Sequence, residues 1–424
     1  MPEFRGGVRT IRAALPGIDR GSVSNGAVSG RHATDVSEET RSTASSRQPH
    51  RRLRGVDAAR AIAVLGMVMA HFGPNPVPDT VLGNLYGVSH GRASVLFALL
   101  AGVGVALLVG DRSHGRPFLA RGRLVFRGAL LLPLGLWLQT LDHGVFVILQ
   151  YYALYFLFAA FVFTLPDRWL LVGGATVLVA GPLVYLWAQM IVPEWSISGD
   201  APMLHDPVGK IARDLLLTGT YPLVTWAAPL LVGLWVGRRD LTATPVRWWL
   251  LVLGLAVAVA TAFAADQLTM AFGETFEALG GSRFAYLLTD QPHSEMPLWM
   301  LGSIGSACAV LGGMLLLADR LPRATWPLAA TGQLALTVYV GHLLLLGAFP
   351  ELLKSETVQA ASFTVGVFML LTAAVCTLWR AVLPRGPLEA VLATPWRIIE
   401  HLTQRVVRGF VMTGRGACGP STRR

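Results

Sequence analysis

Charged residues and cysteines are both scarce in this chain. Asp, Glu, Lys and Arg make up only 14% of the 424 residues, whereas 53% are hydrophobic. An average soluble domain has about 25% charged residues, so the composition excludes an ordinary soluble protein and predicts an integral membrane protein. The three cysteines, Cys308, Cys376 and Cys418, form no CxxC pair and no metal-ligand spacing. They exclude a disulfide framework, and we expect no metal site.

Three further features are missing from the sequence. The net charge is +10, but no single basic domain carries it, because the arginines fall in short runs between apolar segments. This pattern excludes a nucleic-acid-binding protein and is typical of topology signals. The first residues contain no apolar core of the length that a signal peptide requires. No convincing internal repeat relates the two halves of the chain, as many secondary transporters would show.

Long apolar segments recur along the chain, and each is close to the roughly 20 residues that a helix needs to cross a bilayer. They predict an all-α, polytopic membrane helix bundle of about ten transmembrane helices. The segment around residues 215–237 is open to interpretation as a longer or a broken helix. The expected spans are residues 55–73, 91–110, 122–140, 144–164, 169–191, 221–237, 247–265, 297–318, 326–349 and 361–382.

The remaining segments predict the domain organisation and the topology. Residues 1–50 are rich in Ser, Thr, Gly and Arg and predict a disordered tail, residues 51–394 form the helical domain, and residues 395–424 predict a basic amphipathic tail. Arginines concentrate in alternate loops, whereas the opposite loops are longer and mixed or acidic. By the positive-inside rule both termini are cytoplasmic. We expect a multi-pass protein of the plasma membrane.

Polar side chains line one face of the first predicted helix. Eleven steps of about 100° bring His71 back to within roughly 20° of Arg60, so Asp57, Arg60, Val64, Met67 and His71 form one stripe. Charged groups that face lipid are costly, so the stripe should face the bundle interior or a wet cavity. Asp57 and Arg60 are spaced for an i,i+3 ion pair with a structural and electrostatic role.

The histidines cluster on the side that the topology makes external. Six of the ten lie at or near that side: His71, His90, His143, His205, His293 and His342. His71 and His90 flank one loop at the ends of adjacent helices and are the catalytic candidates. His205 and His293 lie in long polar loops and are interpreted as solvated. Asp142 and His143 form either a polar turn or a pair that orients an imidazole.

The stripe also resembles known families. The eleven-residue spacing from Arg60 to His71 is similar to the first-helix motif of the type 3 membrane acyltransferases. The block RGVDAAR at residues 54–60 resembles the start of the heparan-alpha-glucosaminide N-acetyltransferase family and of the YeiB-like bacterial membrane proteins. The second resemblance continues through residues 91–104, 148–154, 332–339 and 385–389 and spans about residues 52–397.

The resemblance implies acyl transfer from cytoplasmic acyl-CoA, for example acetyl-CoA. The acceptor would be a hydroxyl or amine of an extracytoplasmic glycan, lipid or metabolite. The lipid bilayer would surround the protein. The type 3 motif points to His71 as the working histidine, whereas the eukaryotic acetyltransferase points nearer to His90. The sequence is compatible with a homodimer as well as with a monomer. The resemblance also implies donor binding by Arg121, Arg123 and Arg127, for which ordinary positive-inside anchoring is the alternative interpretation. We expect the substrate pocket to contain Arg92, Gln150, Tyr151 and His342.

A different class of protein remains as the alternative to an enzyme. Asp57, Arg60 and the outer histidines could form the proton relay of a secondary transporter or of a lipid or metabolite exporter. A structural or signalling membrane protein would leave the stripe unexplained. We favour the acyltransferase.

Overall fold

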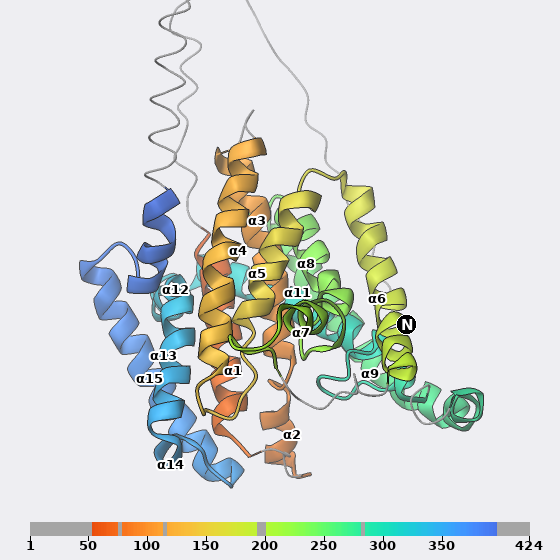
Figure 1. Ribbon diagram of the computed structural model, residues 1–424. Coiled ribbons are helices and arrows are strands. Elements are labelled where there is room, and N and C mark those ends of the chain that lie inside the picture. The colour runs from red at the N-terminus through yellow and green to blue at the C-terminus, as the bar shows by residue number, and fades with distance from the viewer. Residues whose placement is uncertain (1–52, 75–78, 113–116, 193–200, 281–284, 397–424) are drawn as a thin grey trace, which may run out of the picture. The chain divides into compact units, whose positions relative to one another are not determined.

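The described part of the chain is helical (Figure 1). The computed structural model describes residues 53–74, 79–112, 117–192, 201–280 and 285–396, and within these ranges it contains helices and no strands. The predicted all-α class is therefore confirmed. The predicted tail at residues 1–50 and all but the first two residues of the tail at 395–424 lie outside the described residues.

Six of the helices are long and apolar enough to cross a membrane. They are α1 (Arg54–Phe72), α3 (Arg92–Arg112), α6 (Asp167–Ile191), α9 (Thr244–Gly280), α11 (Pro297–Arg320) and α15 (Val358–Val382). Two bent pairs also pass this test. The first joins α7 (Val208–Arg213) and the π-helix η2 (Asp214–Thr218) to α8 (Leu223–Gly237) with a 58° bend, and the second joins α12 (Trp326–Gln333) to α13 (Ala335–Ala348) with a 76° bend.

The expected count of about ten spans is not confirmed. Within the described ranges the number is six, or up to eight when each bent pair is one span. Two expected spans are missing from this set. Helix α5 (Leu149–Val162) has only 14 residues, and α4 (Pro117–Gln139) carries three arginines in its first half, which lower its mean hydropathy. The short α2 (Val81–Gly87), α14 (Pro350–Leu353) and the 3₁₀ turn η3 (Tyr286–Leu288) lie in connections.

The two ends of the bundle can be named after residues of α1: the Arg60 end, where α1 begins, and the His71 end, where it finishes. Short connections at the Arg60 end carry arginine ion pairs. Asp167, in the first turn of α6, pairs with both Arg238 and Arg239 after α8, and its contact with Arg238 measures 2.7 Å. Arg247 at the start of α9 pairs with Asp319 at the end of α11. These pairs tie the turns at this end together.

Helix α1 lies in the centre of the fold and packs against α3, α11 and α12. Its tightest contact is with α12, because a side chain at Gly332 would collide with the backbone carbonyl of Asp57. The bend between α12 and α13 comes directly after Gly332 in the chain. Glu389 stabilises the bend by accepting hydrogen bonds from the backbone N–H groups of Leu336 (2.9 Å) and Thr337 (3.1 Å). A carboxylate suits the first turn of α13, because those N–H groups have no partner within the helix.

The close approach of α1 and α12 gives a first prediction. Replacing Gly332 by Ala should lower the stability of the purified protein by roughly 1–3 kcal/mol, because the new methyl group pushes the two helices apart. Gly341→Ala on α13 is the matched control, since nothing lies within 4 Å of the position that its new methyl group would take. Thermal unfolding in detergent measures both. Equal melting temperatures for the two variants would contradict the prediction.

Candidate functional site

A cavity of ≈ 510 Å³ opens at the Arg60 end of the bundle. Helices α1, α3, α4, α5, α12 and α13 line it together with the helical segment after residue 386. Leucines of α3 and α4 make much of its apolar wall. The polar and charged side chains that line it are Arg60, Arg123, Arg127, Tyr152, Gln333 and Glu389.

Arg60 is held at the cavity by a network that starts from Asp57. The carboxylate of Asp57 is only 2% exposed and accepts a hydrogen bond from Arg60 Nη1 at 2.9 Å. Its other oxygen accepts one from Gln333 Nε2 at 3.1 Å, and Gln333 Oε1 in turn accepts one from Arg380 Nε at 2.6 Å. The structure thus has the i,i+3 pair that the sequence predicts. It also adds partners from α12 and α15 that the spacing on α1 does not indicate.

The three arginines predicted to bind the donor divide between two faces of α4. Arg123 and Arg127 are four residues apart, lie on one helix face and both line the cavity. Arg121 lies on another face and is not among the cavity residues. Its Nε donates to the carbonyl of Ala160 at 3.2 Å, and its guanidinium lies 5.7 Å from the ring centre of Phe163. Arg121 therefore anchors α4 to α5.

At the opposite end of α1, His71 pairs with His342 of α13. The Nδ1 atom of His71 lies 3.0 Å from Nε2 of His342, and the ring planes are 17° apart. His342 is 1% exposed, whereas His71 keeps partial exposure. Between Arg60 and His71 the α1 stripe is closed by buried Val64 and Met67. The structure thus places two predicted residues, His71 and His342, in direct contact, although 271 positions separate them.

An aromatic layer separates the cavity from this histidine pair. The ring of Tyr339 lies 5.1 Å from that of His342 on one side and 6.4 Å from that of Phe97, a cavity residue, on the other. The Tyr339 side chain is fully buried, and its hydroxyl accepts a hydrogen bond from the backbone N–H of Ile148 at 3.1 Å. The cavity therefore ends one residue layer short of the two imidazoles.

His90 and Arg92 lie at the His71 end but outside the cavity. Both ring nitrogens of His90 are shielded from solvent and have no hydrogen bond of ordinary geometry to any residue that the structure describes. Burial lowers the pKa of this imidazole, and the nearby backbone of Tyr86 raises it in part. Arg92 begins α3 directly after His90. His71 contacts His342 rather than His90, so the structure does not bring the two candidate histidines together.

His143 has a structural position. Its Nε2 lies 3.0 Å from the carbonyl of Leu138, and its Nδ1 accepts a hydrogen bond from the backbone N–H of Val145 at 3.3 Å. Because a carbonyl only accepts, Nε2 carries the proton and both ring nitrogens are satisfied. Burial lowers the pKa of His143. The Asp142–His143 sequence is therefore a turn in which the imidazole bonds to backbone.

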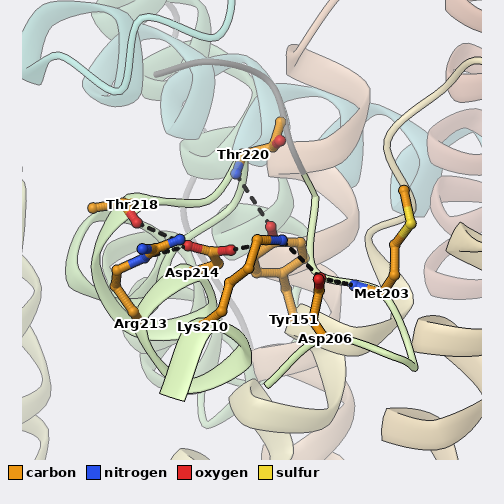
Figure 2. Close-up of polar contacts among 8 residues, drawn as sticks. All are labelled: Tyr151, Met203, Asp206, Lys210, Arg213, Asp214, Thr218 and Thr220. Carbon is orange, nitrogen blue, oxygen red and sulfur yellow. Dashed lines mark hydrogen bonds and ion pairs between the residues drawn. The ribbon is translucent and has the colours of Figure 1, made fainter. Parts of the chain in front are cut away.

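Gln150 and Tyr151 are buried, but neither lines the cavity. Gln150 packs against Gly135 of α4, and its amide has no hydrogen-bond partner among the described residues. The Tyr151 hydroxyl accepts a hydrogen bond from the backbone N–H of Thr220 at 3.2 Å (Figure 2). The next residue, Tyr152, faces the cavity instead and donates its hydroxyl proton to the carbonyl of Phe97.

The segment in front of α8 owes its shape to a cluster of ion pairs around Asp214 (Figure 2). Lys210 Nζ lies 2.7 Å from Asp206 and 3.6 Å from Asp214, and Arg213 Nε donates to Asp214 at 2.8 Å. The backbone N–H of Gly219 reaches the Asp214 carbonyl at 2.9 Å, which closes a π-helical turn. The Tyr151 hydroxyl thus bonds to the short segment between η2 and α8.

Glu295 is a buried acid that the sequence interpretation did not single out. It lies in the loop before α11, is 2% exposed, and accepts a hydrogen bond from the Thr225 hydroxyl at 3.0 Å. Burial raises the pKa of its carboxyl to about 8, and the Thr225 hydrogen bond opposes the rise only in part. The nearby His293 is exposed, as predicted, but its ring lies 5.7 Å from Tyr221 and 5.9 Å from Trp299.

Three cavity residues were not among the site residues proposed from the sequence: Tyr152, Gln333 and Glu389. Each lies beside or inside a stretch that carries the family resemblance, at residues 148–154, 332–339 and 385–389. The family resemblance was therefore the one sequence feature that could have indicated these three residues. No spacing within a single helix could assign them to a common cavity, because they lie on different helices. No group of three or more His, Cys, Asp or Glu side chains that could hold a metal ion occurs in the part of the chain that the structure describes.

The raised pKa of Glu295 predicts a pH-dependent stability. Below the ordinary glutamate pKa of about 4.5 the acid is neutral in the folded and unfolded states. As pH rises toward 8 the unfolded state ionises while the folded state keeps its proton, so stability falls by up to a few kcal/mol. Glu295→Gln should remove this loss. Melting temperatures between pH 5 and 8 measure it, with the exposed Glu274→Gln as control, and parallel curves for Glu295→Gln and wild type would contradict the assignment.

Two comparisons with known proteins bear on this arrangement. Residues 52–249 match the family model described as heparan-alpha-glucosaminide N-acetyltransferase, catalytic, and residues 237–397 match that of a protein of unknown function (DUF418), a YeiB-like family. No curated protein matched the sequence. The cavity has walls from both matched regions, and the His71–His342 pair takes one imidazole from each. Together the two matches span residues 52–397, and they support the resemblance of this chain to the heparan-alpha-glucosaminide N-acetyltransferase-like and YeiB-like superfamily of transmembrane acyltransferases.

Proposed function

We propose that the protein transfers an acyl group, by preference acetyl, from acyl-CoA to a hydroxyl or amine of an extracytoplasmic acceptor. One observation carries the proposal: α1 and α13 both run from a cavity lined by arginines to a pair of hydrogen-bonded imidazoles. An anionic donor suits the first site and a proton acceptor suits the second. The family supports acyl transfer as the reaction.

The cavity suits the donor in both charge and wall chemistry. Arg60, Arg123 and Arg127 present cationic groups that can bind phosphates of coenzyme A, and guanidinium groups are well shaped for phosphate oxygens. Leucines of α3 and α4 offer an apolar wall for the pantetheine arm. The thioester would then point toward the Phe97–Tyr339 layer and the histidines beyond it. We place the donor in this cavity and the acceptor at the His71 end.

The imidazole of His71 supplies the base in this scheme. As the acceptor oxygen or nitrogen attacks the thioester carbonyl, its proton passes to His71 and the carbon–sulfur bond breaks. The thiolate of coenzyme A then takes the proton, which restores the neutral imidazole. Such general base catalysis contributes roughly 10²- to 10⁴-fold in rate. In the alternative mechanism the acyl group is first bonded covalently to the His71 imidazole and then passes to the acceptor, with the donor in the same cavity.

The donor site gives a prediction with a control on the same helix. Arg127→Gln should raise the KM for acetyl-CoA about 10-fold or more, because a charge-assisted hydrogen bond is worth roughly 1.5–3 kcal/mol. Arg121→Gln should leave this KM unchanged, since Arg121 does not line the cavity. Steady-state transfer and acetyl-CoA titration with purified protein measure both effects. An equal response of the two variants would place the donor elsewhere.

The same assays separate the enzyme from a transporter. His71→Ala should reduce transfer by about 10²-fold or more while acetyl-CoA still binds, because the base lies outside the donor cavity. A wild-type protein that neither binds nor consumes acyl-CoA would overturn the proposed function. A proton-coupled exporter would give that result.

The proposal also requires that the Arg60 end faces the cytoplasm, where acyl-CoA is made. The concentration of arginines in the connections at that end supports this orientation, with both termini inside. We propose the plasma membrane as the location. Single cysteines at the exposed positions of Arg168 and His205, in a cysteine-free background, test it. A membrane-impermeant maleimide should label position 205 on intact cells and position 168 only after permeabilisation. The reverse pattern would invert the topology.

A further inference from the structure

The hydrogen-bond partners of His342 determine which of its ring nitrogens carries a proton. Its Nδ1 lies 3.3 Å from the backbone carbonyl of Val338, one helical turn earlier. A carbonyl oxygen can only accept, so Nδ1 must be the donor. In a neutral imidazole the other nitrogen is then unprotonated. Burial disfavours a second proton, because His342 is only 1% exposed. Nε2 of His342 is therefore a hydrogen-bond acceptor.

This assignment propagates to His71. Its Nδ1 lies 3.0 Å from the acceptor Nε2 of His342, so His71 must carry its proton on Nδ1. The Nε2 atom of His71 is then left with a free lone pair. Of the four ring nitrogens in the pair, this is the one available to take a proton from another molecule.

We propose that His342 is a positioning residue that holds His71 in the tautomer with an unprotonated Nε2. The catalytic consequence rests on the proposed function, in which His71 is the base. His342 touches neither the donor cavity nor the reacting atoms in this scheme. It acts through His71, much as a carboxylate orients and selects the tautomer of a catalytic histidine elsewhere.

Several contacts fix the position of the His342 ring. The ring of Tyr339 packs edge-on at 5.1 Å, and its own hydroxyl is fixed by the backbone N–H of Ile148. The two imidazole rings are nearly parallel, with their planes 17° apart and their centres 5.2 Å apart. The position of α13 depends on the bend after α12, which Glu389 stabilises through the N–H groups of Leu336 and Thr337.

Two replacements of His342 separate the positioning role from simple packing. Gln can place an amide oxygen near the position of Nε2 and accept from His71, whereas Leu fills the space without an acceptor. His342→Leu should lower kcat by roughly 10²- to 10⁴-fold with the acetyl-CoA KM unchanged. His342→Gln should recover at least 10-fold of that loss. Melting temperatures of both variants show that each is folded.

The tautomer itself can be measured without any activity. In full-length protein labelled with ¹⁵N-histidine, NMR shifts distinguish protonated from unprotonated ring nitrogens, and His71→Ala identifies the signals of His71. We expect Nδ1–H with unprotonated Nε2 in the wild type and in His342→Gln, and loss of that preference in His342→Leu. A wild-type His71 protonated on Nε2, or a folded His342→Gln no more active than His342→Leu, would overturn the proposal. Absence of transfer by the wild type would instead overturn the proposed function, while the NMR result still decides the tautomer.

Discussion

A carboxylate inside an apolar helix bundle has to be paired, and Asp57 is the group on which this constraint acts. It is almost completely buried, and an unpaired charge there would cost several kcal/mol. It accepts hydrogen bonds from Arg60 on α1 and Gln333 on α12, and Arg380 on α15 bonds in turn to Gln333, so the network spans three helices. Satisfying one charge therefore fixes how three helices meet. It also presents Arg60 at the edge of the cavity.

The same constraint reaches the other end of the bundle. With α12 held against α1 at Gly332, the chain bends and α13 begins, and α13 runs alongside α1 until His342 meets His71. The Asp57–Gln333 hydrogen bond at one end and the imidazole pair at the other thus both join α1 to the bent α12–α13 pair. The aromatic layer around Tyr339 fills the interval. The proposed donor and acceptor sites are set by one helix packing rather than by independent loops.

The sequence predicts the helical class, most helix positions and the α1 stripe, because each depends on periodicity within one segment. The count of spans is not confirmed, since apolar length alone does not reveal the break after Gln333 or how short α5 is. The pairing of His71 with His342 is also beyond a spacing argument, as the two belong to helices far apart in the chain. Arg121 and Arg123 look equivalent in sequence, yet a turn of about 200° between them puts one on Phe163 and the other in the cavity.

The buried ring of Tyr339 has a consequence for the membrane as an electrical barrier. A polar cavity entering from one side and the partly exposed His71 ring at the other would together form most of an ion-conducting path. Tyr339, packed between Phe97 and His342 and tied to the backbone of Ile148, interrupts that path with a layer that holds no mobile charge. A protein built this way can carry polar groups deep in the bilayer and still leave the transmembrane potential undissipated.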